Sequence, residues 1–374
     1  MIDVTVSYRL IQGFANLTVG QVIMILVGCV LIYLAIAKEY EPVLLLPIGI
    51  GAIMANIPVT GMTEPEGFFG ILYDVGIKNE LFPLLIFVGV GAMTDFSPLL
   101  ARPYTVLLGA AAQFGIFGTL LVATLMGFKI NEAASIGIIG SADGPTSIYV
   151  AAALAPKLLA PIAVAAYSYM ALVPIIQPPI IKALTTKAER AIPMTYSDGK
   201  SVSQTTKILF PIVVTLVCGL IAPLSTPLIG MLMLGNLLRE AGVVQRLSNM
   251  AQNELINIVT LFLGLAIGST MVADKFLQWQ TLGILCLGLV AFALDTVAGL
   301  AFGKAFSIIT KGKINPLIGA CGISAFPMSA RVISRMGLEA NPNNFLIMHA
   351  MASNTAGQIG SVMAGGAIMA LLAH

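Results

Sequence analysis

Long apolar runs separated by short polar stretches recur along the whole chain. A run of about 20 residues is long enough for a helix to cross the hydrocarbon core of a bilayer. Runs near this length or somewhat shorter occupy residues 20–37, 42–57, 81–93, 104–126, 160–184, 207–223, 226–238, 255–273, 280–302 and 343–372. The pattern predicts an all-α polytopic membrane protein with about ten transmembrane helices.

Two further segments are too interrupted to cross as simple helices. Residues 133–155 contain GSADGPTS, in which glycines, a proline and Asp143 break the apolar sequence, and residues 314–338 contain GISAFPMS. Unpaired backbone groups cost several kcal/mol in a bilayer, so irregular chain is tolerated there only inside protein or along a wet cavity. We expect two broken re-entrant hairpins that meet something polar.

The two halves of the chain resemble each other. GSADGPTS aligns with GISAFPMS, and ELFPLLIFVGVGAMT (80–94) resembles ELINIVTLFLGLAIGST (254–270). The polar stretch 185–206 separates the halves. We therefore predict an amphipathic N-terminal lead-in (1–19), a first membrane repeat (20–184), a cytoplasmic linker (185–206) and a second membrane repeat (207–374).

The parity of the spans predicts that the second repeat is inverted. Each half holds five candidate spans, and a broken segment that enters and leaves by one face leaves the number of crossings odd. With the linker in the cytoplasm, fourteen of the nineteen Lys and Arg residues lie inside, as the positive-inside rule favours. The remaining five lie outside: Arg9, Lys78, Lys129, Lys157 and Lys275.

Composition supports the membrane class and excludes others. Hydrophobic residues make up 58% of the chain and charged residues 10%, whereas soluble domains carry about a quarter charged residues. No basic run interleaved with aromatic residues suggests nucleic-acid binding. The four cysteines are far apart in apolar surroundings, which indicates packing rather than a metal site or disulfides. The first nineteen residues lack the pattern of a cleavable signal peptide.

Asp143 is the main candidate for chemistry. Helix ends inside a membrane expose groups that bind ions near the midplane, and hard oxygen ligands suit Na⁺ or a proton. Ser141 and Thr146 lie beside Asp143 in the sequence, and the second half offers Asn315, Ser324 and Asn354. The structural alternative is that Asp143 only caps a helix beginning at Gly144-Pro145. A carboxylate within a span costs ~3 kcal/mol or more, which favours the ion site.

Arg331 and Arg335 follow the second interruption, one helical turn apart. They are either positive-inside anchors or an anion receptor, because a guanidinium grips a carboxylate with two parallel hydrogen bonds. Tyr167 and Tyr169 both fit packing, and Tyr169 also allows a site role.

Two further polar residues stand within predicted spans. Asp295 fits a structural role and a proton or ion relay equally, and the sequence favours hydrogen-bonded packing over titration for His349.

Four sequence blocks carry a family resemblance. GSADGPTSIYVAAALAP, AYSYMALVPIIQPPIIKAL, NPLIGACGISAFPMSARV and NNFLIMHAMASNTAGQIGSVMAGG resemble the membrane-embedded beta subunit of the sodium-translocating, biotin-dependent decarboxylases. The resemblance runs along nearly the whole chain. It implies an elevator-type, inverted-repeat subunit in a prokaryotic inner membrane, which decarboxylates carboxybiotin, consumes a proton and drives Na⁺ out of the cell.

The resemblance also implies partners and site residues. The partners are a carboxyltransferase alpha subunit, a biotin carrier subunit, a small membrane-anchor subunit and further copies of this chain in a trimer. For Na⁺ the matching positions are Asp143, Asn315, Gly319, Ser324 and Asn354. Tyr169 and Arg331 match positions linked to the carboxybiotin and proton steps. The short N-terminal region is more similar to glutaconyl-CoA or methylmalonyl-CoA enzymes than to oxaloacetate members.

Two other functions remain open at this point. A secondary transporter, in which a Na⁺ or H⁺ gradient moves an organic anion, fits the broken segments equally well. A purely structural membrane subunit leaves Asp143 unexplained. A biotin carrier partner would distinguish the decarboxylase from the secondary transporter. The chain itself holds no biotin-attachment lysine motif and no recognisable acyl-CoA site.

Overall fold

The computed structural model describes residues 12–141, 143–194, 202–325 and 327–372. Within these ranges the chain forms helices and turns and no strand, which confirms the all-α class. Most of the expected lead-in (1–19) and the middle of the expected linker (185–206) lie outside the described residues, so the predicted domain boundaries stay predictions.

The first half is a series of helices of very unequal length. Its α-helices are α2 (Val19–Ala37), α3 (Pro42–Ala55), α4 (Phe68–Tyr73), α5 (Leu81–Met93), α6 (Ser97–Ala101), α7 (Thr105–Ala112), α8 (Phe114–Leu125), α9 (Ile130–Gly137), α10 (Gly144–Leu154) and α11 (Leu159–Leu184). A π-helical turn, η1 (Asp74–Lys78), and two 3₁₀ segments, η2 (Ile138–Ser141) and η3 (Pro156–Leu158), join some of them. Helix α12 (Lys187–Arg190) follows in the linker.

The second half has a similar composition of long and short elements. Its α-helices are α13 (Gln204–Ile221), α14 (Thr226–Glu240), α15 (Gln245–Met250), α16 (Ile256–Ser269), α17 (Ala273–Phe276), α18 (Trp279–Ile309), α19 (Met328–Ala340) and α20 (Ile347–Leu372). The shorter segments are η4 (Pro223–Ser225), η5 (Ala251–Leu255) and η6 (Pro316–Gly322). Sequence signals start several helices: Thr18 and Gln21 form a capping box before α2, and Ser203 caps α13.

Within the described ranges, six helical stretches are long and apolar enough to cross a membrane, or up to eight if each of two bent pairs counts as one span. The six are Val19–Ala37, Thr105–Leu125, Gln204–Ile221, Gln245–Ser269, Trp279–Ile309 and Ile347–Leu372, and the bent pairs are Phe68–Lys78 with Leu81–Met93 (59°) and Pro156–Met170 with Leu172–Leu184 (66°). About ten spans were expected. The count is lower because two apolar runs form helices of only 14 residues (α3) and 15 residues (α14).

Helices from the two halves pair in a reciprocal way. Helix α3 packs on α16, and α5 packs on α14. The sequence alignment of 80–94 with 254–270 makes α5 the counterpart of α16, so exchanging the halves turns one pair into the other. Glycines line both contacts, Gly51 against Gly268 and Gly235 against Val88 and Ala92, which allows close helix approach in a membrane. This reciprocity supports the duplicated unit, and the inversion and the elevator type stay predictions.

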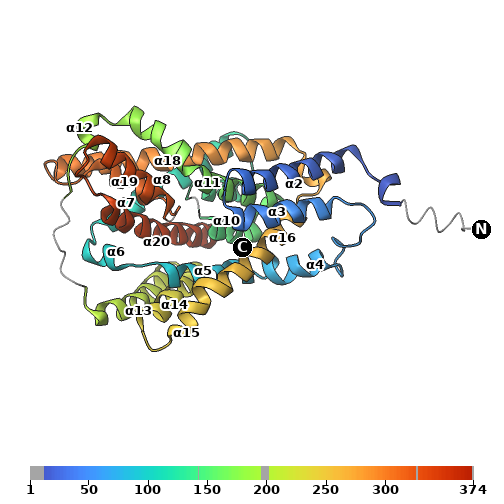
Figure 1. The fold of residues 1–374 in the computed structure, drawn as a ribbon, viewed down its shortest axis with the longest axis horizontal. Coiled ribbons are helices and arrows are strands. Elements are labelled where there is room, and N and C mark those ends of the chain that lie inside the picture. The colour runs from blue at the N-terminus through green and yellow to red at the C-terminus, as the bar shows by residue number, and fades with distance from the viewer. Residues whose placement is uncertain (1–11, 142, 195–201, 326, 373–374) are drawn as a thin grey trace, which may run out of the picture.

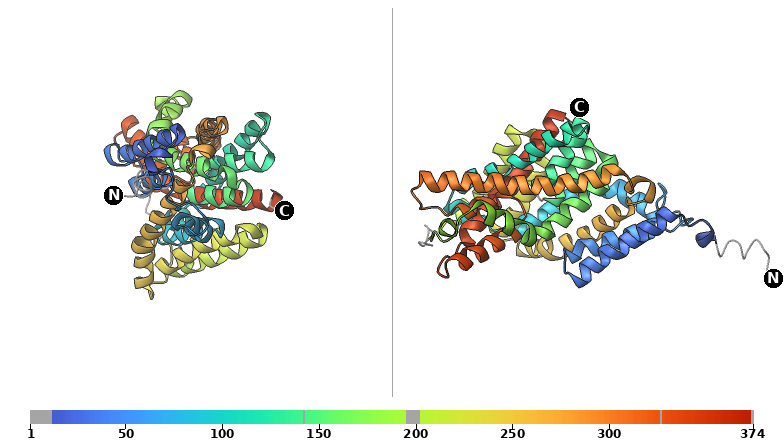
Figure 2. Two further views of the ribbon diagram at one scale, coloured as in Figure 1. Left: turned by 90° about the vertical axis from the view of Figure 1, so that its right-hand side faces the viewer. Right: turned by 90° about the horizontal axis from the view of Figure 1, so that it is seen from above.

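The two interrupted segments lie against the same long helices. Helix α18 packs on both η2 and η6, and α20 packs on η6, α7 and α10. Figures 1 and 2 show α18 as a long helix along the upper side of the molecule, and Figure 1 shows α20 below it. Segments far apart in the sequence are thereby held in one bundle.

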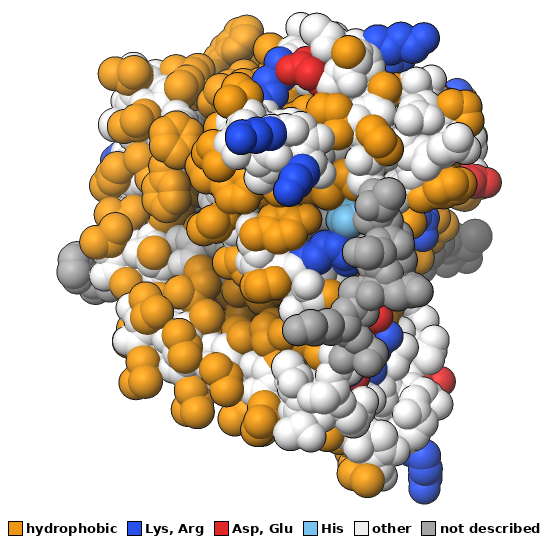
Figure 3. Space-filling model, turned by 90° about the vertical axis from the view of Figure 1, so that its left-hand side faces the viewer, with side chains coloured by type: hydrophobic (Ala, Val, Ile, Leu, Met, Phe, Trp, Pro, Cys, Tyr) orange, Lys and Arg blue, Asp and Glu red, His pale blue; other side chains and the backbone are white. Residues whose placement is uncertain are grey.

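Residues expected on opposite sides of the membrane collect at different places. A cavity of about 1200 Å³, walled by α4, η3 and the connection from α16 to α18, is lined by Lys78, Lys157 and Lys275, three of the five cations expected outside. At the other end, Lys304 pairs with Glu189 of α12 at 3.0 Å. Figure 3 views the end where α12 and α19 lie and shows lysine and arginine side chains gathered there among apolar ones. This grouping agrees with the predicted sidedness.

Candidate functional site

Asp143 stands at the first interruption, directly before α10. Its carboxylate accepts hydrogen bonds from the Thr146 hydroxyl at 2.7 Å and the Thr146 backbone N–H at 3.4 Å. Pro145 occupies the first turn, where a missing N–H costs nothing. Asp143 is therefore the N-cap of α10, as the structural alternative proposed, and it is only 8% exposed.

A second donor reaches Asp143 from the far end of the chain. The hydroxyl of Ser361, on α20, lies 3.1 Å from Asp143 Oδ2. A helix needs only one side-chain cap, so a carboxylate held by two hydroxyls from separate elements has more polar contacts than a cap requires. The sequence analysis missed Ser361. The available signal was its position seven residues after Asn354, which places both on one side of a helix.

The tyrosine beside Asp143 is Tyr167. Its ring covers Gly144, where an added Cβ would collide with it, and its hydroxyl is within electrostatic range of the Asp143 carboxylate. Tyr169 lies two residues on and faces α18, where its hydroxyl donates to the carbonyl of Leu285 and its ring packs on Gly288. The role expected for Tyr169 stays a prediction.

Asn315 lies at the end of the second interruption that faces the linker. Its side-chain oxygen accepts from the Leu317 N–H and caps η6, and its amide nitrogen donates to the carbonyls of Arg190 at 3.0 Å and Ile192 at 2.8 Å. Gly319, in the middle of η6, packs against α18, where an added Cβ would lie 3.0 Å from the Cα of Gly303. Both residues have clear structural roles, and their place among the Na⁺ ligands stays a prediction.

Asn354 lies at the other end of η6. It is fully buried on α20, and its amide nitrogen donates to the carbonyls of Ile323 at 2.6 Å and Cys321 at 3.3 Å. Ser324 follows these carbonyls and is also buried. Seven residues along α20 separate Asn354 from Ser361, a rise of ~10 Å. Helix α20 thus connects the second interruption to Asp143.

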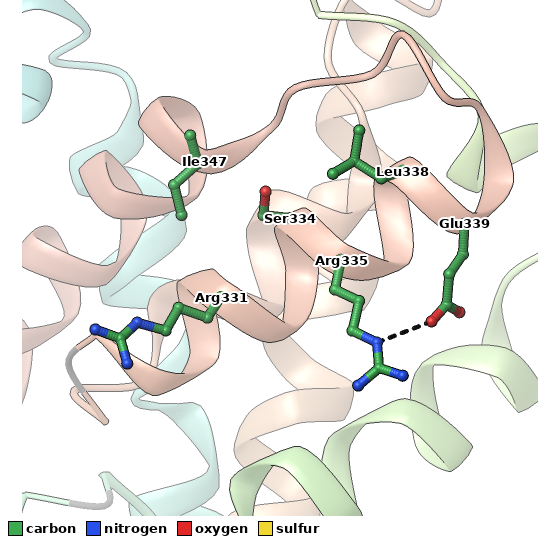
Figure 4. Close-up of a pocket in the computed structure, with 6 residues that line it drawn as sticks. All are labelled: Arg331, Ser334, Arg335, Leu338, Glu339 and Ile347. Atoms are coloured by element: carbon green, nitrogen blue, oxygen red, sulfur yellow. Dashed lines mark hydrogen bonds and ion pairs between the residues drawn. The ribbon is translucent and has the colours of Figure 1, made fainter.

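Arg331 lines an open cavity of about 550 Å³ between α19 and the start of α20. Figure 4 shows its side chain pointing away from Arg335, whose guanidinium pairs with Glu339 at 3.1 Å. Among the described residues the Arg331 guanidinium has no hydrogen bond or ion pair. It is the arginine of this pair that is available to an anion from solution.

Asp295 and His349 are both buried without satisfied polar atoms. Neither oxygen of Asp295 and neither ring nitrogen of His349 has a hydrogen-bond partner of normal geometry within the part of the chain that the structure describes. The Asp295 carboxylate lies against Gly115 and Gly140, near the amide groups that begin α8. A helix N-terminus favours a carboxylate, so this contact supports the structural reading. His349 lies near Arg102.

The atoms at these interruptions that could bind a cation are oxygen atoms. The described residues contain no group of three or more His, Cys, Asp or Glu side chains that could hold a metal ion. Carboxylate, hydroxyl, amide and carbonyl oxygens suit a hard cation such as Na⁺. A buried carboxylate before a short helix, among helices long and apolar enough to cross a membrane, is typical of ion-translocating membrane proteins.

Comparison with known proteins narrows this class to one family. Residues 20–372 match the family described as the Na⁺-transporting oxaloacetate decarboxylase beta subunit. The chain is 54% identical to the glutaconyl-CoA decarboxylase subunit beta of Acidaminococcus fermentans, with 96% of each chain covered. It is 55% identical to the methylmalonyl-CoA decarboxylase subunit beta of Veillonella parvula, covering 97% of this chain and 96% of that one. Identity to oxaloacetate decarboxylase beta chain 2 of Salmonella typhi is 50%, with 96% of each covered.

The chain therefore belongs to the beta-subunit family of the Na⁺-transporting decarboxylases. This confirms the family expected from the sequence blocks. Proteins of this family are membrane subunits of multi-subunit decarboxylases that transport Na⁺.

Proposed function

We propose that this chain decarboxylates carboxybiotin and couples that reaction to the export of Na⁺ across a prokaryotic inner membrane. The observation that carries the proposal is the buried Asp143 carboxylate at a broken helix, with hydroxyl groups from Thr146 and Ser361 on it. Asp143 binds Na⁺ in one state of the cycle and a proton in the other. Competition of the two ions for one carboxylate couples their flows.

The carboxybiotin end of the reaction lies at the cavity beside Arg331. Carboxybiotin is an anion, and an unpaired guanidinium holds its carboxylate with two parallel hydrogen bonds. When the bond between the ureido nitrogen and the carboxylate carbon breaks, CO₂ leaves and the electron pair stays on the nitrogen, which takes up a proton. Tyr169 and Asp143 are the groups that we assign to supplying this proton.

The proposal needs partners that this chain does not contain. A carboxyltransferase alpha subunit loads biotin on a separate carrier subunit, a small membrane-anchor subunit joins the assembly, and the beta chain forms a trimer. The chain's ligands for Na⁺ are Asp143, Asn315, Gly319, Ser324 and Asn354. The 54% and 55% identities favour an acyl-CoA as the primary substrate of the complex, as the names of those two relatives state for them.

The test uses the complex purified from its native membrane and reconstituted in vesicles. A biotinylated partner should co-purify and react with streptavidin, and addition of the acyl donor should drive ²²Na⁺ uptake with no imposed ion gradient. A secondary transporter would instead need an ion gradient and would break no bond. Asp143→Asn keeps the shape and removes the charge, so it should abolish both Na⁺ uptake and Na⁺-stimulated decarboxylation while the complex stays assembled. Normal pumping by this variant would reduce Asp143 to a helix cap.

A further inference from the structure

Two fully buried asparagines share one carbonyl of the linker. The amide nitrogens of Asn315 and Asn344 lie 3.0 Å and 3.2 Å from the carbonyl oxygen of Arg190, and both side chains are 0% exposed. Asn315 donates at the same time to the carbonyl of Ile192 at 2.8 Å. The side-chain oxygen of Asn344 accepts from the backbone N–H of Met194 at 3.3 Å. Side chains of the second half of the chain thus hold the linker at three points.

A third asparagine holds the carbonyl between these points. Asn341 follows the last residue of α19 and donates to the carbonyl of Ala191 at 3.2 Å. One residue before the first of these carbonyls, Glu189 pairs with Lys304 of α18 at 3.0 Å. We call residues 189–194 the linker strap. Its three successive carbonyls all accept hydrogen bonds from asparagine side chains.

These bonds exceed what the connection itself needs. Surface segments usually pair their backbone groups with water or with nearby backbone. The strap carbonyls instead bind amides from two separate places, the start of η6 and the turn between α19 and α20. Asn343, in the same turn, shows the ordinary case: it is exposed, and its side chain makes no hydrogen bond within the described ranges. Asn341 and Asn344 therefore differ from their neighbour in what they bind.

The strap connects the two parts of the proposed reaction site. Asn315 stands directly before η6 and is one of the predicted Na⁺ ligands. Asn341 lies ten residues after Arg331 along α19, a rise of ~15 Å. Helix α12, which leads into the strap, packs on both α19 and η6, and Figure 1 shows it beside α19. A displacement of α19 is therefore passed to Asn315 through the strap.

The strap also fixes the direction of the Asn315 amide. Its side-chain oxygen accepts from the Leu317 N–H at 3.0 Å, and its nitrogen is held by two strap carbonyls. The last torsion of an asparagine side chain has a broad energy minimum, so an amide without these partners turns easily. A ligand that is oriented in advance loses less conformational entropy when it binds a cation.

We propose that Asn341 and Asn344 are positioning residues for the predicted Na⁺ ligand Asn315, and that they act through the linker strap. This proposal rests on the proposed function. Asn344 holds the same carbonyl that holds Asn315, and Asn341 ties the strap to the helix that carries Arg331. The Na⁺ affinity of the second interruption then depends on the strap being in place.

The experiment measures the initial rate of decarboxylation by the reconstituted complex against NaCl concentration at constant ionic strength. Asn344→Asp keeps the size of the side chain and the acceptor for Met194, and it replaces the amide donor with an oxygen that repels the Arg190 carbonyl. The Na⁺ concentration for half-maximal rate should rise about tenfold, while the rate at saturating Na⁺ stays within about twofold of the parent. Asn343→Asp is the matched control, since it adds the same charge to the same turn. It should leave half-saturation within about twofold of the parent.

A second variant covers the case in which Asn344→Asp does not assemble. Asn341→Asp changes a half-buried side chain and removes one donor, so it should raise half-saturation about threefold. The proposal is overturned if the assembled variants keep the half-saturation of the parent, if their rates fall by the same factor at every Na⁺ concentration, or if Asn343→Asp shifts equally. Failure of both variants to assemble would also overturn it, because the asparagines would then serve folding. A parent complex whose decarboxylation does not respond to Na⁺ would overturn the proposed function itself.

Discussion

Removing the Ser361 hydroxyl tests whether the contact across the two halves serves the ion site. Ser361 Oγ lies 3.1 Å from Asp143 Oδ2, and no other residue of the second half is seen on this carboxylate within the described ranges. In the variant Ser361→Ala, Asp143 keeps its bonds from Thr146 and loses the one that ties it to α20. We expect the carboxylate to be less well positioned for Na⁺.

The size of the effect follows from the kind of bond that is lost. A hydrogen bond to a charged group contributes about 1.5–3 kcal/mol. Since 1.4 kcal/mol corresponds to about a tenfold change in an equilibrium constant, half-saturation by Na⁺ should rise by roughly ten- to hundredfold. The lower end is the better expectation, because Thr146 remains in place and restrains the carboxylate.

The assay is the initial rate of decarboxylation by the reconstituted complex against NaCl concentration at constant ionic strength. The matched control is Ser353→Ala, two helical turns earlier on α20, where the hydroxyl is equally buried and has no partner among the described residues. Removing an unpaired buried hydroxyl should leave the Na⁺ dependence unchanged and stability the same or slightly higher. An unchanged Na⁺ dependence for Ser361→Ala, or an equal shift in both variants, would refute the reasoning.

Two further predictions concern the end of the molecule where α12 and α19 lie. Arg331→Lys keeps the charge and loses the two parallel hydrogen bonds to a carboxylate, so the decarboxylation rate should fall about tenfold or more while ²²Na⁺ binding persists. The control, Arg335→Lys, should change the rate less than about twofold. Equal rates in the two variants would contradict the assignment of Arg331 as the carboxylate receptor. Burial raises the pKa of Glu189, but hydrogen bonds from Thr186 and the Lys304 ammonium group outweigh this and hold the pKa below its usual 4.5. Because the folded pKa is lowered, this contact stabilises α12 above pH 4.5 by at most about 1 kcal/mol and is lost as the pH falls through the lowered value. A spin label at residue 188 should gain mobility on acidification in the parent and be mobile at every pH in Glu189→Gln; pH-independent mobility in both would contradict this.

The interrupted segments were predictable because their causes are local. Gly144-Pro145 after Asp143 specifies a helix start with a side-chain cap, and the structure has Asp143 as that cap. The grouping of Lys78, Lys157 and Lys275 around one cavity was predictable for a similar reason, since each lies in a short polar stretch between apolar runs. The side of the membrane on which they lie stays a prediction. Span counting was less successful, because α3 and α14 are shorter than the apolar runs that predicted them.

The choice of partners at the site depended on helix rotation. Tyr167 and Tyr169 are two residues apart, which places them about 200° apart around α11, and the sequence does not say which face meets the first interruption. In the structure the Tyr169 ring packs on Gly288, so Tyr169 faces α18, and the Tyr167 ring covers Gly144. Asn315 likewise turned toward the linker carbonyls, because it caps the end of η6 that lies farther from Asn354.

By itself the sequence determined the membrane class, the two interruptions and the family, since bilayer thickness, helix-start signals and specific residue blocks are properties of neighbouring residues. The duplication of the two halves stays a prediction from the sequence. Only the tertiary structure decided which groups meet. Ser361 reaches Asp143 across 218 residues, and Gln113 and Asn354 converge on carbonyls 321–323 from two different helices. The close approach of α18 and η6 at Gly299, Gly303 and Gly319 is likewise a contact between distant segments. Such packing fixes the rotation and depth of each helix, which no local pattern of residues specifies.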